Sequence, residues 1–343
     1  MSAEERPPES TLWSLLRGAM ATKALAVAAD LRIADELAAG PRPVAELAAA
    51  AGADEESLYR FLRALASEGV FAEHEPRVFG NTAASELLRT DHPASWHDFA
   101  HLFGGVWYRT FEDAEVAVRT GEETFPRSFG MDFWAWLAKD PVEGSSFNRA
   151  MASGADRKVE AIDAAEWRPG DTVVDVGGGN GVTLIGLLQR HPELEGVVFE
   201  TAETAREAEV LVAASDVADR CRVVAGSFFA GVPSGDAYVL GAILHDWDDD
   251  RAAAILRNIQ AAARPNARLI VRDAVIPSGN EPHGNKWLDL LMLLLQRGRE
   301  RTEEQWRRLL GDAGFAVTSI SDGLIEAECR ATHPSNRRGD EHR

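Results

Sequence analysis

A run of glycines directly after an apolar segment constrains the fold of this chain more than any other feature. Residues 172–176 (TVVDV) have the composition of a buried strand, and residues 177–181 (GGGNG) follow them without a break. Glycine lets the backbone approach a ligand closely, and the exposed amides at the start of a helix attract negative charge. The segment therefore predicts a strand, a ligand-binding turn, and a helix over residues 182–190.

The spacing of the glycines distinguishes between two classes of nucleotide cofactor that bind such a turn. The dinucleotide fingerprint G-x-G-x-x-G/A fails, because from each possible first glycine a required position is held by Asn180, Val182 or Leu184. The pattern acid-x-G-x-G-x-G fits, with Asp175 at its head, and it is typical of methyltransferases that bind S-adenosylmethionine (SAM). Glu200 ends the next apolar segment, where a carboxylate can accept hydrogen bonds from both ribose hydroxyls. A tight turn without a ligand is the simpler alternative, which the preceding strand and Glu200 disfavour.

Strand-like and helical segments alternate through the C-terminal half of the chain. This alternation is typical of an α/β fold with a mostly parallel sheet covered on both faces. Two last apolar segments are joined by a short turn and predict a hairpin that pairs antiparallel at the edge of the sheet. We expect strands at 172–176, 197–199, 222–224, 238–241 and 268–272, helices at 182–190, 203–214 and 250–263, and the hairpin at 317–320 and 324–327.

The first hundred residues predict helices followed by a short hairpin, which is the outline of a winged helix. We expect one long helix from Leu12 to about Gly40, a second over 44–51, and a third that begins after the N-cap residue Asp54. The hairpin is expected between residues 70 and 79.

A DNA-binding function for this winged helix is disfavoured by its charge. Residues 1–100 contain 9 Lys and Arg against 16 Asp and Glu, and the whole chain carries a formal net charge of −19. Nucleic-acid affinity depends mostly on cations that neutralise phosphates. A helix that enters the major groove should also begin with basic or amide side chains, whereas this one begins with Asp54, Glu55 and Glu56. We expect no nucleic-acid partner, and we interpret the region as a dimerisation module.

Composition and the first residues indicate a cytoplasmic protein with no membrane partner. The start of the sequence, MSAEERPPES, is polar and acidic and lacks the pattern of a signal peptide. The apolar run at 290–295 is far too short to span a bilayer. Two cysteines, Cys221 and Cys329, cannot form a disulfide framework or a cysteine-rich zinc site.

Residues 91–165 are helical and unusually rich in aromatic side chains. Most of these side chains are expected to pack in the core, but a cap over a flat apolar ligand is a second interpretation. They are Trp96, Phe99, Phe103, Trp107, Tyr108, Phe111, Phe125, Phe129, Phe133, Trp134, Trp136 and Phe147.

Four motifs in order give the chain a resemblance to a known family. They are VVDVGGGNG (173–181), VAGSFFAGVPSGDAYVLGAILHDWDDD (224–250), LIVRDAVIP (269–277) and QRGRERTEEQW (296–306), followed by AGF at 313–315. From about Leu12 to Ala327 the sequence resembles the plant-type small-molecule O-methyltransferases and their bacterial relatives in antibiotic and pigment biosynthesis. The resemblance implies a Rossmann-like SAM domain over residues 166–330 and an all-helical, winged-helix-like dimerisation domain over 1–95. Residues 96–165 would form a helical linker and substrate cap, and residues 331–343 a disordered tail.

The resemblance also implies roles for individual residues around the cofactor. Asp175 and the turn glycines Gly177, Gly179 and Gly181 would line SAM, and Glu200 would hold its ribose. Near the adenine we expect Ser227, Phe228 and Trp247.

The same resemblance implies a catalytic group and a substrate pocket. His245 would be the general base, flanked by the carboxylates of Asp273 and Glu300, either of which would orient it. Asp246 would help to position the base or the substrate. The substrate-binding residues implied are Trp134, Phe147, Asn148, Met151, Asp246, Asp289 and Met292.

Three positions depart from the family pattern. Gly241 stands where plant members often have a lysine, so the cofactor carboxylate would need another cation, and Arg149 and Arg157 are the candidates. Ser227 stands where aspartate is common, and Glu200 is one methylene longer than the usual aspartate. None of these differences removes a reacting group.

The resulting hypothesis is a SAM-dependent O-methyltransferase that acts as a homodimer on a phenolic hydroxyl of an aromatic secondary metabolite. The charged residues after His245 would otherwise suit the amino end of the helix at 250–263, so a purely structural histidine is the alternative for that residue. Nitrogen or carbon methylation and a hydroxylase-like activity are alternatives within the same fold. No metal is expected, because the nearest third ligand downstream of His245 and Asp246 is His283 in a proline-rich loop. A winged-helix regulator that senses a small molecule is disfavoured, and it predicts DNA binding that weakens with salt.

Overall fold

The computed structural model describes residues 7–321 and 323–330, which form two compact units. The first unit comprises residues up to 155 together with 294–296, and the second comprises residues 156–293 and those from 297 onward. The predicted four-part division of the chain stays a prediction. The predicted tail at 331–343 lies outside the described residues.

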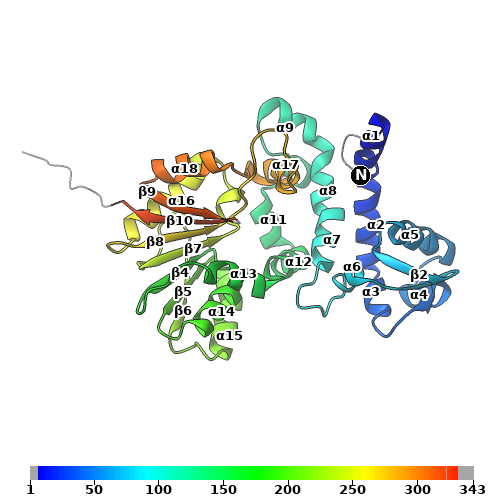
Figure 1. The fold of residues 1–343 in the computed structure, drawn as a ribbon, viewed down its shortest axis with the longest axis horizontal. Helices are drawn as coiled ribbons and strands as arrows, with labels where there is room; N and C mark the ends of the chain where they lie inside the picture. The colour runs from blue at the N-terminus through cyan, green and yellow to red at the C-terminus, as the bar shows by residue number, and fades with distance from the viewer. Residues whose placement is uncertain (1–6, 322, 331–343) are drawn as a thin grey trace, which may run out of the picture. The chain divides into compact units, whose positions relative to one another are not determined.

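A seven-stranded sheet forms the centre of the second unit (Figure 1). Its order is β6-β5-β4-β7-β8-β10-β9, in which β4 to β8 are parallel and β10 is antiparallel to both β8 and β9. The predicted mostly parallel sheet with an antiparallel hairpin is therefore confirmed. The strands are β4 (Thr172–Val176), β5 (Glu195–Glu200), β6 (Cys221–Ala225), β7 (Ala237–Gly241), β8 (Arg268–Arg272), β9 (Phe315–Ser321) and β10 (Leu324–Cys329).

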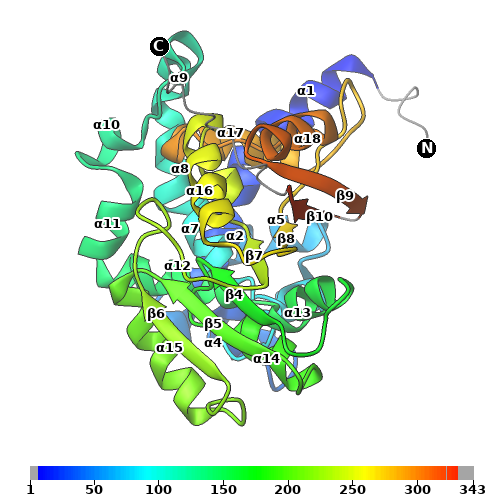
Figure 2. The same ribbon diagram turned by 90° about the vertical axis from the view of Figure 1, so that its left-hand side faces the viewer.

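Helices cover both faces of this sheet (Figure 2). Successive residues of each strand point to opposite faces, so Val173 and Val198 pack in one core and Val174 and Val197 in the other. One core includes α13 (Ala155–Asp163), α14 (Val182–Arg190) and α15 (Ala202–Ala214), and the other includes α16 (Asp249–Ala262) and α18 (Glu303–Asp312).

The strand order places the glycine turn at the point where the connections of the sheet reverse direction. Strand β4 pairs with β5 on one side and with β7 on the other. In open parallel sheets ligands bind at such a switch point, beyond the carboxyl ends of the strands. Several predicted site residues end or directly follow these strands, so they meet at the carboxyl ends of the strands. They are Gly177, Glu200, the turn after Gly241, and Asp273.

The first unit contains the predicted helices and hairpin, with one correction. The single helix expected from Leu12 to Gly40 is wrong, because the chain forms α1 (Pro8–Leu16), α2 (Gly18–Asp30) and α3 (Ile33–Glu36). Arg32 adopts a left-handed conformation with φ of 54°. The resulting change of direction buries Ile33 and Leu37 in the core of the unit, and this burial outweighs the local helical pattern.

The two shorter helices and the hairpin are present as expected, and the winged-helix interpretation stays a prediction. Helix α4 (Val44–Ala51) ends at Gly52, which has φ of 62°. Helix α5 (Glu55–Ser67) begins after Asp54, whose side chain accepts a hydrogen bond of 2.9 Å from the Ser57 amide. Strands β2 (Phe71–Glu75) and β3 (Val78–Asn81) form the hairpin, and the short β1 (Arg42–Pro43) pairs with β3.

The helices after the hairpin include the aromatic-rich segment. Ring contacts join Phe125 to Phe129, Phe133 and Trp136, so much of the aromatic surface is used in packing. The elements are α6 (Ala83–Glu86), α7 (His97–Gly104), α8 (Val106–Thr110), the 3-10 turn η2 (Phe111–Asp113), α9 (Ala114–Thr120), α10 (Phe125–Phe129), α11 (Phe133–Lys139), α12 (Pro141–Ala152) and, shared between the two units, α17 (Asn285–Gln296).

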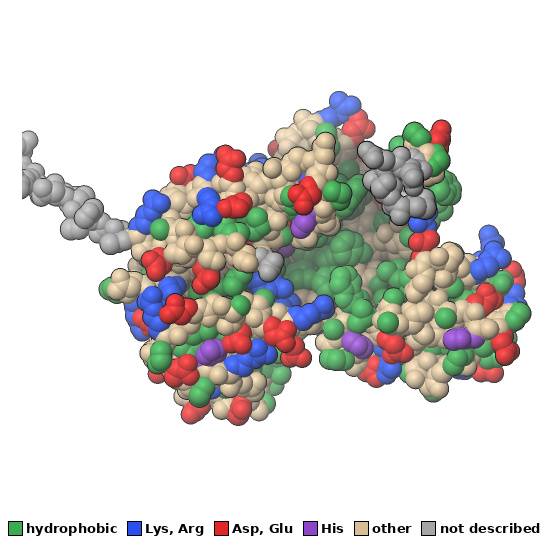
Figure 3. All heavy atoms as spheres, viewed as in Figure 1, with side chains coloured by type: hydrophobic (Ala, Val, Ile, Leu, Met, Phe, Trp, Pro, Cys, Tyr) green, Lys and Arg blue, Asp and Glu red, His purple; other side chains and the backbone are tan. Residues whose placement is uncertain are grey.

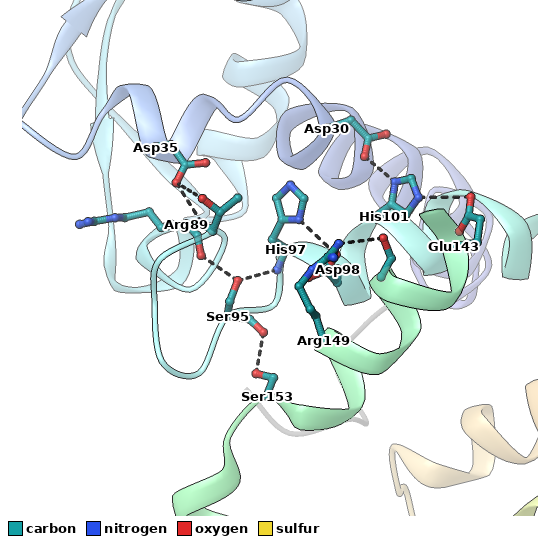
Figure 4. Close-up of polar contacts among 12 residues, drawn as sticks. Asp30, Asp35, Arg89, Ser95, His97, Asp98, His101, Glu143, Arg149 and Ser153 are labelled. Carbon is teal, nitrogen blue, oxygen red and sulfur yellow. Dashed lines mark hydrogen bonds and ion pairs between the residues drawn. The ribbon is translucent and has the colours of Figure 1, made fainter. Parts of the chain in front are cut away.

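A polar cluster joins three helices of the first unit (Figure 4). On α7, His101 contacts Asp30 of α2 through Nδ1 at 2.7 Å and Glu143 of α12 through Nε2 at 3.4 Å. Next to it, the guanidinium of Arg149 donates two hydrogen bonds, of 3.0 and 2.7 Å, to the carboxylate of Asp98. These contacts fix α7 between its neighbouring helices.

In the part of the chain that the structure describes, no helix is both long enough and apolar enough to cross a membrane. Acidic and basic side chains are interspersed over the face of the second unit that is visible in Figure 3. The absence of a nucleic-acid partner stays a prediction.

Candidate active site

The glycine turn after β4 has a backbone that only glycine adopts without strain. Gly177, Gly179 and Gly181 have φ values of 73°, 57° and 82°, in the left-handed region that other residues rarely occupy. A Cβ atom on Gly177 would also lie under 3.0 Å from the side chain of Ile243. A Cβ atom on Gly179 would meet no described atom within 4 Å, so this turn borders open space that a ligand can fill.

Two carboxylates flank the turn, as predicted. Glu200 accepts hydrogen bonds from the amide of Gly179 at 3.0 Å and from the amide of Thr201 at 2.7 Å. Asp175 is almost fully buried. Burial and the nearby charge of Glu200 raise the pKa of Asp175 to about 7, whereas Lys158 opposes the shift. Glu200 thus connects the turn to β5, while each of its oxygens retains capacity for a further hydrogen bond.

Lys158 on α13 is a candidate cation for the cofactor carboxylate that the sequence did not reveal. Burial, followed by the charge of Arg272, lowers the pKa of this lysine to about 8, and Asp175 opposes the shift. The sequence did contain a clue to this residue. Gly241 stands where plant members often have a lysine, so another cation is needed, and Lys158 directly follows the predicted candidate Arg157. The other predicted candidate, Arg149, already pairs with Asp98.

Aromatic rings line the region predicted to receive an adenine. The Phe228 and Trp247 rings lie 6.0 Å apart at an angle of 76°. Phe229 was not predicted, and its ring lies 4.8 Å from that of Trp247 at 89°. The Asn258 side chain donates a hydrogen bond of 2.8 Å to the Phe228 carbonyl and so holds this loop. The structure therefore brings Phe228 and Trp247 together next to Ser227.

His245 lies in the short 3-10 turn η3 (Leu244–Asp246) after β7. Its Nδ1 atom is 2.9 Å from Oε1 of Glu300, so Glu300 is the carboxylate in direct contact with the imidazole. The Nε2 atom lies 3.6 Å from Oδ1 of Asp246. Asp273 is buried nearby, and the charge of His245 acts on its pKa. The predicted catalytic residues are thus brought together from three separate segments.

The charges around His245 determine its protonation state. Burial lowers the pKa of His245, but Asp246, Asp273 and Glu300 outweigh that effect and raise the pKa to about 10. Burial and the charge of Glu300 raise the pKa of Asp273 to about 6, although His245 and Arg301 oppose this shift. At neutral pH the imidazole is therefore protonated and forms an ion pair with Glu300.

The segment after α17 holds Glu300 against His245. The amide of Arg299 donates a hydrogen bond of 2.8 Å to the carbonyl of His245. The amide of Glu300 donates one of 2.7 Å to the Asp289 carboxylate. Gly298 allows the close approach, because a Cβ atom there would lie under 3.0 Å from the His245 carbonyl oxygen. Asp289, predicted to contact substrate, thus has a structural contact with the Glu300 backbone.

The predicted substrate-binding residues are divided between the two units. In the first unit, the Trp134 and Phe147 rings lie 5.6 Å apart at 86°, and Asn148 and Met151 are half-buried on α12. In the second unit, Met292 is buried and therefore contributes mainly to packing. Contact of these residues with a substrate stays a prediction.

Within residues 7–321 and 323–330, no group of three or more His, Cys, Asp or Glu side chains is arranged to hold a metal ion.

The chain is similar to known proteins over nearly its whole length. Residues 13–91 match the model of an O-methyltransferase dimerisation domain, and residues 108–316 match that of an O-methyltransferase domain. The chain is 40% identical over 329 residues to the phenazine O-methyltransferase PhzM of Lysobacter antibioticus, spanning 94% of this chain and 96% of that protein. It is 36% identical over 304 residues to the aclacinomycin 10-hydroxylase RdmB of Streptomyces purpurascens, spanning 86% and 81%.

A solved structure extends the comparison to ligands. It is that of an O-methyltransferase from neocarzinostatin biosynthesis in complex with S-adenosyl-L-homocysteine (SAH) and 1,4-dihydroxy-2-naphthoic acid. It matches this chain with a TM-score of 0.77 and 37% identity, covering 90% of this chain and 95% of that chain. The resemblance inferred from the sequence motifs is confirmed by these matches.

Proposed function

The chain belongs to the O-methyltransferase family whose members carry an N-terminal dimerisation domain, and we propose that it uses SAM to methylate a phenolic hydroxyl of an aromatic secondary metabolite. The contact between His245 and Glu300 carries this proposal, because it positions a base two residues after Ile243, whose side chain lies against Gly177 of the glycine turn. The names of the phenazine enzyme and of the naphthoic acid complex support the cofactor and the acceptor class. The relative named as a 10-hydroxylase means that family membership alone does not define the reaction.

We assign the cofactor to the turn after β4. The open space beside Gly179 accepts the amino-acid and ribose parts of SAM, and Glu200 accepts hydrogen bonds from the ribose hydroxyls. Phe228 and Trp247 would border the adenine, and the Ser227 hydroxyl would hydrogen-bond its edge. When bound, SAM supplies a methyl group activated by a positively charged sulfur.

Arg157 and Lys158 are the cations that we assign to the cofactor carboxylate. They are adjacent on α13, and the charges of Lys158 and Asp175, at the end of β4, act on each other. The charge of Arg157 also acts on Arg272, at the end of β8, whose pKa is lowered by burial and then by that charge. Arg157, Lys158 and Arg272 thus lie close enough to influence one another, and they supply the positive charge that Gly241 cannot.

His245 acts in this proposal as the general base. Glu300 holds the Nδ1 side of the ring, which leaves Nε2 to accept the phenol proton. The phenol proton would pass to Nε2, while SAM held by the turn would supply the methyl group to the phenol oxygen. The products are a methyl ether, SAH and an imidazolium that Glu300 stabilises, as the carboxylate does in a catalytic triad. A positioned base typically contributes about 10²- to 10⁴-fold in rate.

The raised pKa of His245 fits this role. A base with a pKa of about 10 matches the pKa of a phenol, about 10 in tyrosine. Proton transfer between the two therefore has little free-energy cost. His245 must lose a proton before it can act as a base, because the imidazole is protonated at neutral pH. Turnover should therefore rise with pH above neutrality.

The remaining parts of the proposal concern the acceptor and the assembly. Trp134, Phe147, Asn148 and Met151 of the first unit, and Asp246, Asp289 and Met292 of the second, remain the residues that we expect to contact a flat acceptor. We also propose a homodimer through the first unit. An exposed apolar surface on its first two helices supports this assembly, and it consists of Leu12, Trp13, Leu15, Leu16 and Met20.

A screen of phenols with methyl-labelled SAM tests the proposal. We expect at least one bicyclic or tricyclic phenol to become labelled, and His245→Gln to lower that turnover by about 100-fold or more. Calorimetry should give a dissociation constant for SAH that differs by less than about threefold, because the base lies outside the cofactor's binding groups. His283→Gln, in an exposed loop, is the matched control. Full turnover of His245→Gln would exclude the assigned role.

A further inference from the structure

Arg301 has a guanidinium group that is completely buried, and the proposed reaction does not use it. One Nη atom donates a hydrogen bond of 2.9 Å to the Leu244 carbonyl, and the other donates one of 2.8 Å to the Trp247 carbonyl. The Nε atom donates one of 3.0 Å to the carboxylate of Asp249. Because a buried arginine is costly unless it is fully paired, this set of partners indicates a defined task.

The two carbonyls that Arg301 binds enclose the base. Leu244 precedes His245 and Trp247 follows Asp246, so one guanidinium spans the whole of η3. A three-residue turn has little hydrogen bonding of its own to hold it. Its external contacts are therefore decisive, and they come from the neighbouring segment that carries Glu300.

Arg301 is itself held in place at both ends. The amide of Ile276, just after β8, donates a hydrogen bond of 3.0 Å to the Arg301 carbonyl. The guanidinium lies over the Trp306 ring, 5.2 Å from its centre. The Trp306 ring nitrogen in turn donates a hydrogen bond of 3.0 Å to the Ala274 carbonyl. These contacts fix the position of Arg301 relative to the segment after β8 and relative to α18.

We propose that Arg301 is a positioning residue for methyl transfer. Its guanidinium holds the His245 turn at hydrogen-bonding distance from Glu300 and connects this turn with Trp247. The proposal rests on the proposed function, because it acts through His245. Arginine suits the task better than lysine, since its planar fork bonds two carbonyls at once whereas an ammonium group lacks that fixed geometry. Its charge also offsets the neighbouring carboxylates, because it acts to lower the pKa values of Asp273 and Asp289.

Arg301→Lys tests this positioning role while keeping the charge. We expect turnover of the best phenol from the screen to fall by about 10- to 100-fold, because displacement of a catalytic group by about 1 Å has an effect of that order. The KM for SAM should change by less than about threefold, because the groups that bind the cofactor remain. Arg268→Lys is the matched control, since Arg268 is also buried and pairs with Asp171 at 2.6 Å but lies at the opposite end of β8.

A double-mutant cycle separates positioning from general stability. We expect Arg301→Lys to slow the wild-type enzyme but to have no further effect in a His245→Gln background, because the group that it positions is then absent. An equal loss in both backgrounds would overturn the inference while leaving the proposed function intact. Full activity of His245→Gln alone would instead overturn the proposed function.

A titration gives a readout that does not depend on an acceptor. Histidine NMR of the enzyme bound to SAH should show the pKa of His245 falling by about one pH unit in Arg301→Lys, because a looser contact with Glu300 favours the imidazolium less. An unchanged pKa would count against positioning.

If Arg301→Lys does not fold, Asp249→Asn takes its place. The Asp249 side chain is 43% exposed, so the substitution should be tolerated. It removes the anionic partner of the Arg301 guanidinium and also that of Arg299, whose own side chain is 45% exposed. We expect a loss of turnover of about threefold to tenfold that disappears in the His245→Gln background. Unchanged turnover would overturn the inference.

Discussion

The Nδ1 atom of His245 lies 2.9 Å from Oε1 of Glu300, a residue 55 positions later in the chain whose side chain has no exposed surface. A buried carboxylate at this distance determines both the orientation of the imidazole and its affinity for a proton. The pair therefore connects the geometry of the site to the pH dependence of the reaction.

Replacing Glu300 should move the pH profile. A base is active above its pKa, so the wild-type rate should rise with pH toward the His245 pKa of about 10. Glu300→Gln removes an opposite charge that raises this pKa, so the rising limb should shift to lower pH by about 1 to 3 units. The plateau should also fall by about tenfold or more, because the imidazolium loses its counter-charge. Measurement of kcat/KM from pH 6 to 10 checks both effects.

The exposed Glu304 provides a control for that experiment. Glu304→Gln should leave the profile unchanged. If the rising limb of the pH profile reflects ionisation of the acceptor's hydroxyl, it should not move in Glu300→Gln. That result would contradict the assignment of the limb to His245.

Adding a methyl group to the glycine turn should weaken cofactor binding. Gly177→Ala places a Cβ atom under 3.0 Å from Ile243 in a backbone conformation with φ of 73°. We expect SAH affinity measured by calorimetry to fall by about tenfold or more, because the turn must move. Gly170→Ala is the control, since it has a similar φ of 85° but no atom within 4 Å of the new Cβ. Equal effects of the two substitutions would mean that backbone strain alone is responsible.

Charging the apolar surface of α1 should disrupt the homodimer. Leu16 is 68% exposed in the single chain, and a buried leucine contributes about 1.5 to 3 kcal/mol. We expect Leu16→Glu to shift the protein toward a monomer by light scattering at micromolar concentration. Val210→Glu introduces the same charge at a residue of similar exposure on the second unit and should not change the mass. A wild-type monomer would contradict the assembly.

The His101 cluster should make stability depend on pH (Figure 4). The hydrogen bond to Asp30 is the main cause that raises the pKa of His101 to about 9. Because the folded value exceeds the unfolded value of about 6.5, the stabilisation is complete below pH 6.5 and is lost as the pH rises through 9. We expect His101→Gln to cost about 1 kcal/mol at pH 6 and less at pH 9.5.

Urea unfolding at the two pH values measures this difference. The exposed His74 serves as the control through His74→Gln. A loss of stability for His101→Gln that is equal at both pH values would argue for packing alone.

The elements that could be predicted from the sequence are those with strong local signals. Strands β4 and β8 and helix α14 begin and end at the predicted residues, because apolar runs there are followed by glycine or polar residues. The helix expected from Leu12 to Gly40 is interrupted first at Arg17, beside the internal Gly18, and again at Arg32, which has no glycine or proline next to it. Its break at Arg32 follows from the burial of Ile33 and Leu37, which is a tertiary effect.

The site shows the same division between local and distant information. The glycine turn and Glu200 follow from spacing along one stretch of chain. The choice between Asp273 and Glu300 as the partner of His245 depended on contacts between segments far apart in sequence. Arg301 lies within a charged run typical of an exposed surface, so nothing local distinguished it from the solvated arginines around it.

The contact between Gly177 and Ile243 has a consequence for how this enzyme can vary. The turn that contains Gly177 and the loop that leads to His245 touch at a place with no room for another carbon atom. A relative with alanine at the first position would therefore need a shorter side chain at the second, so Ile243→Ala should act as a suppressor of Gly177→Ala. The two positions should then covary, although they lie in loops that follow two different strands, β4 and β7.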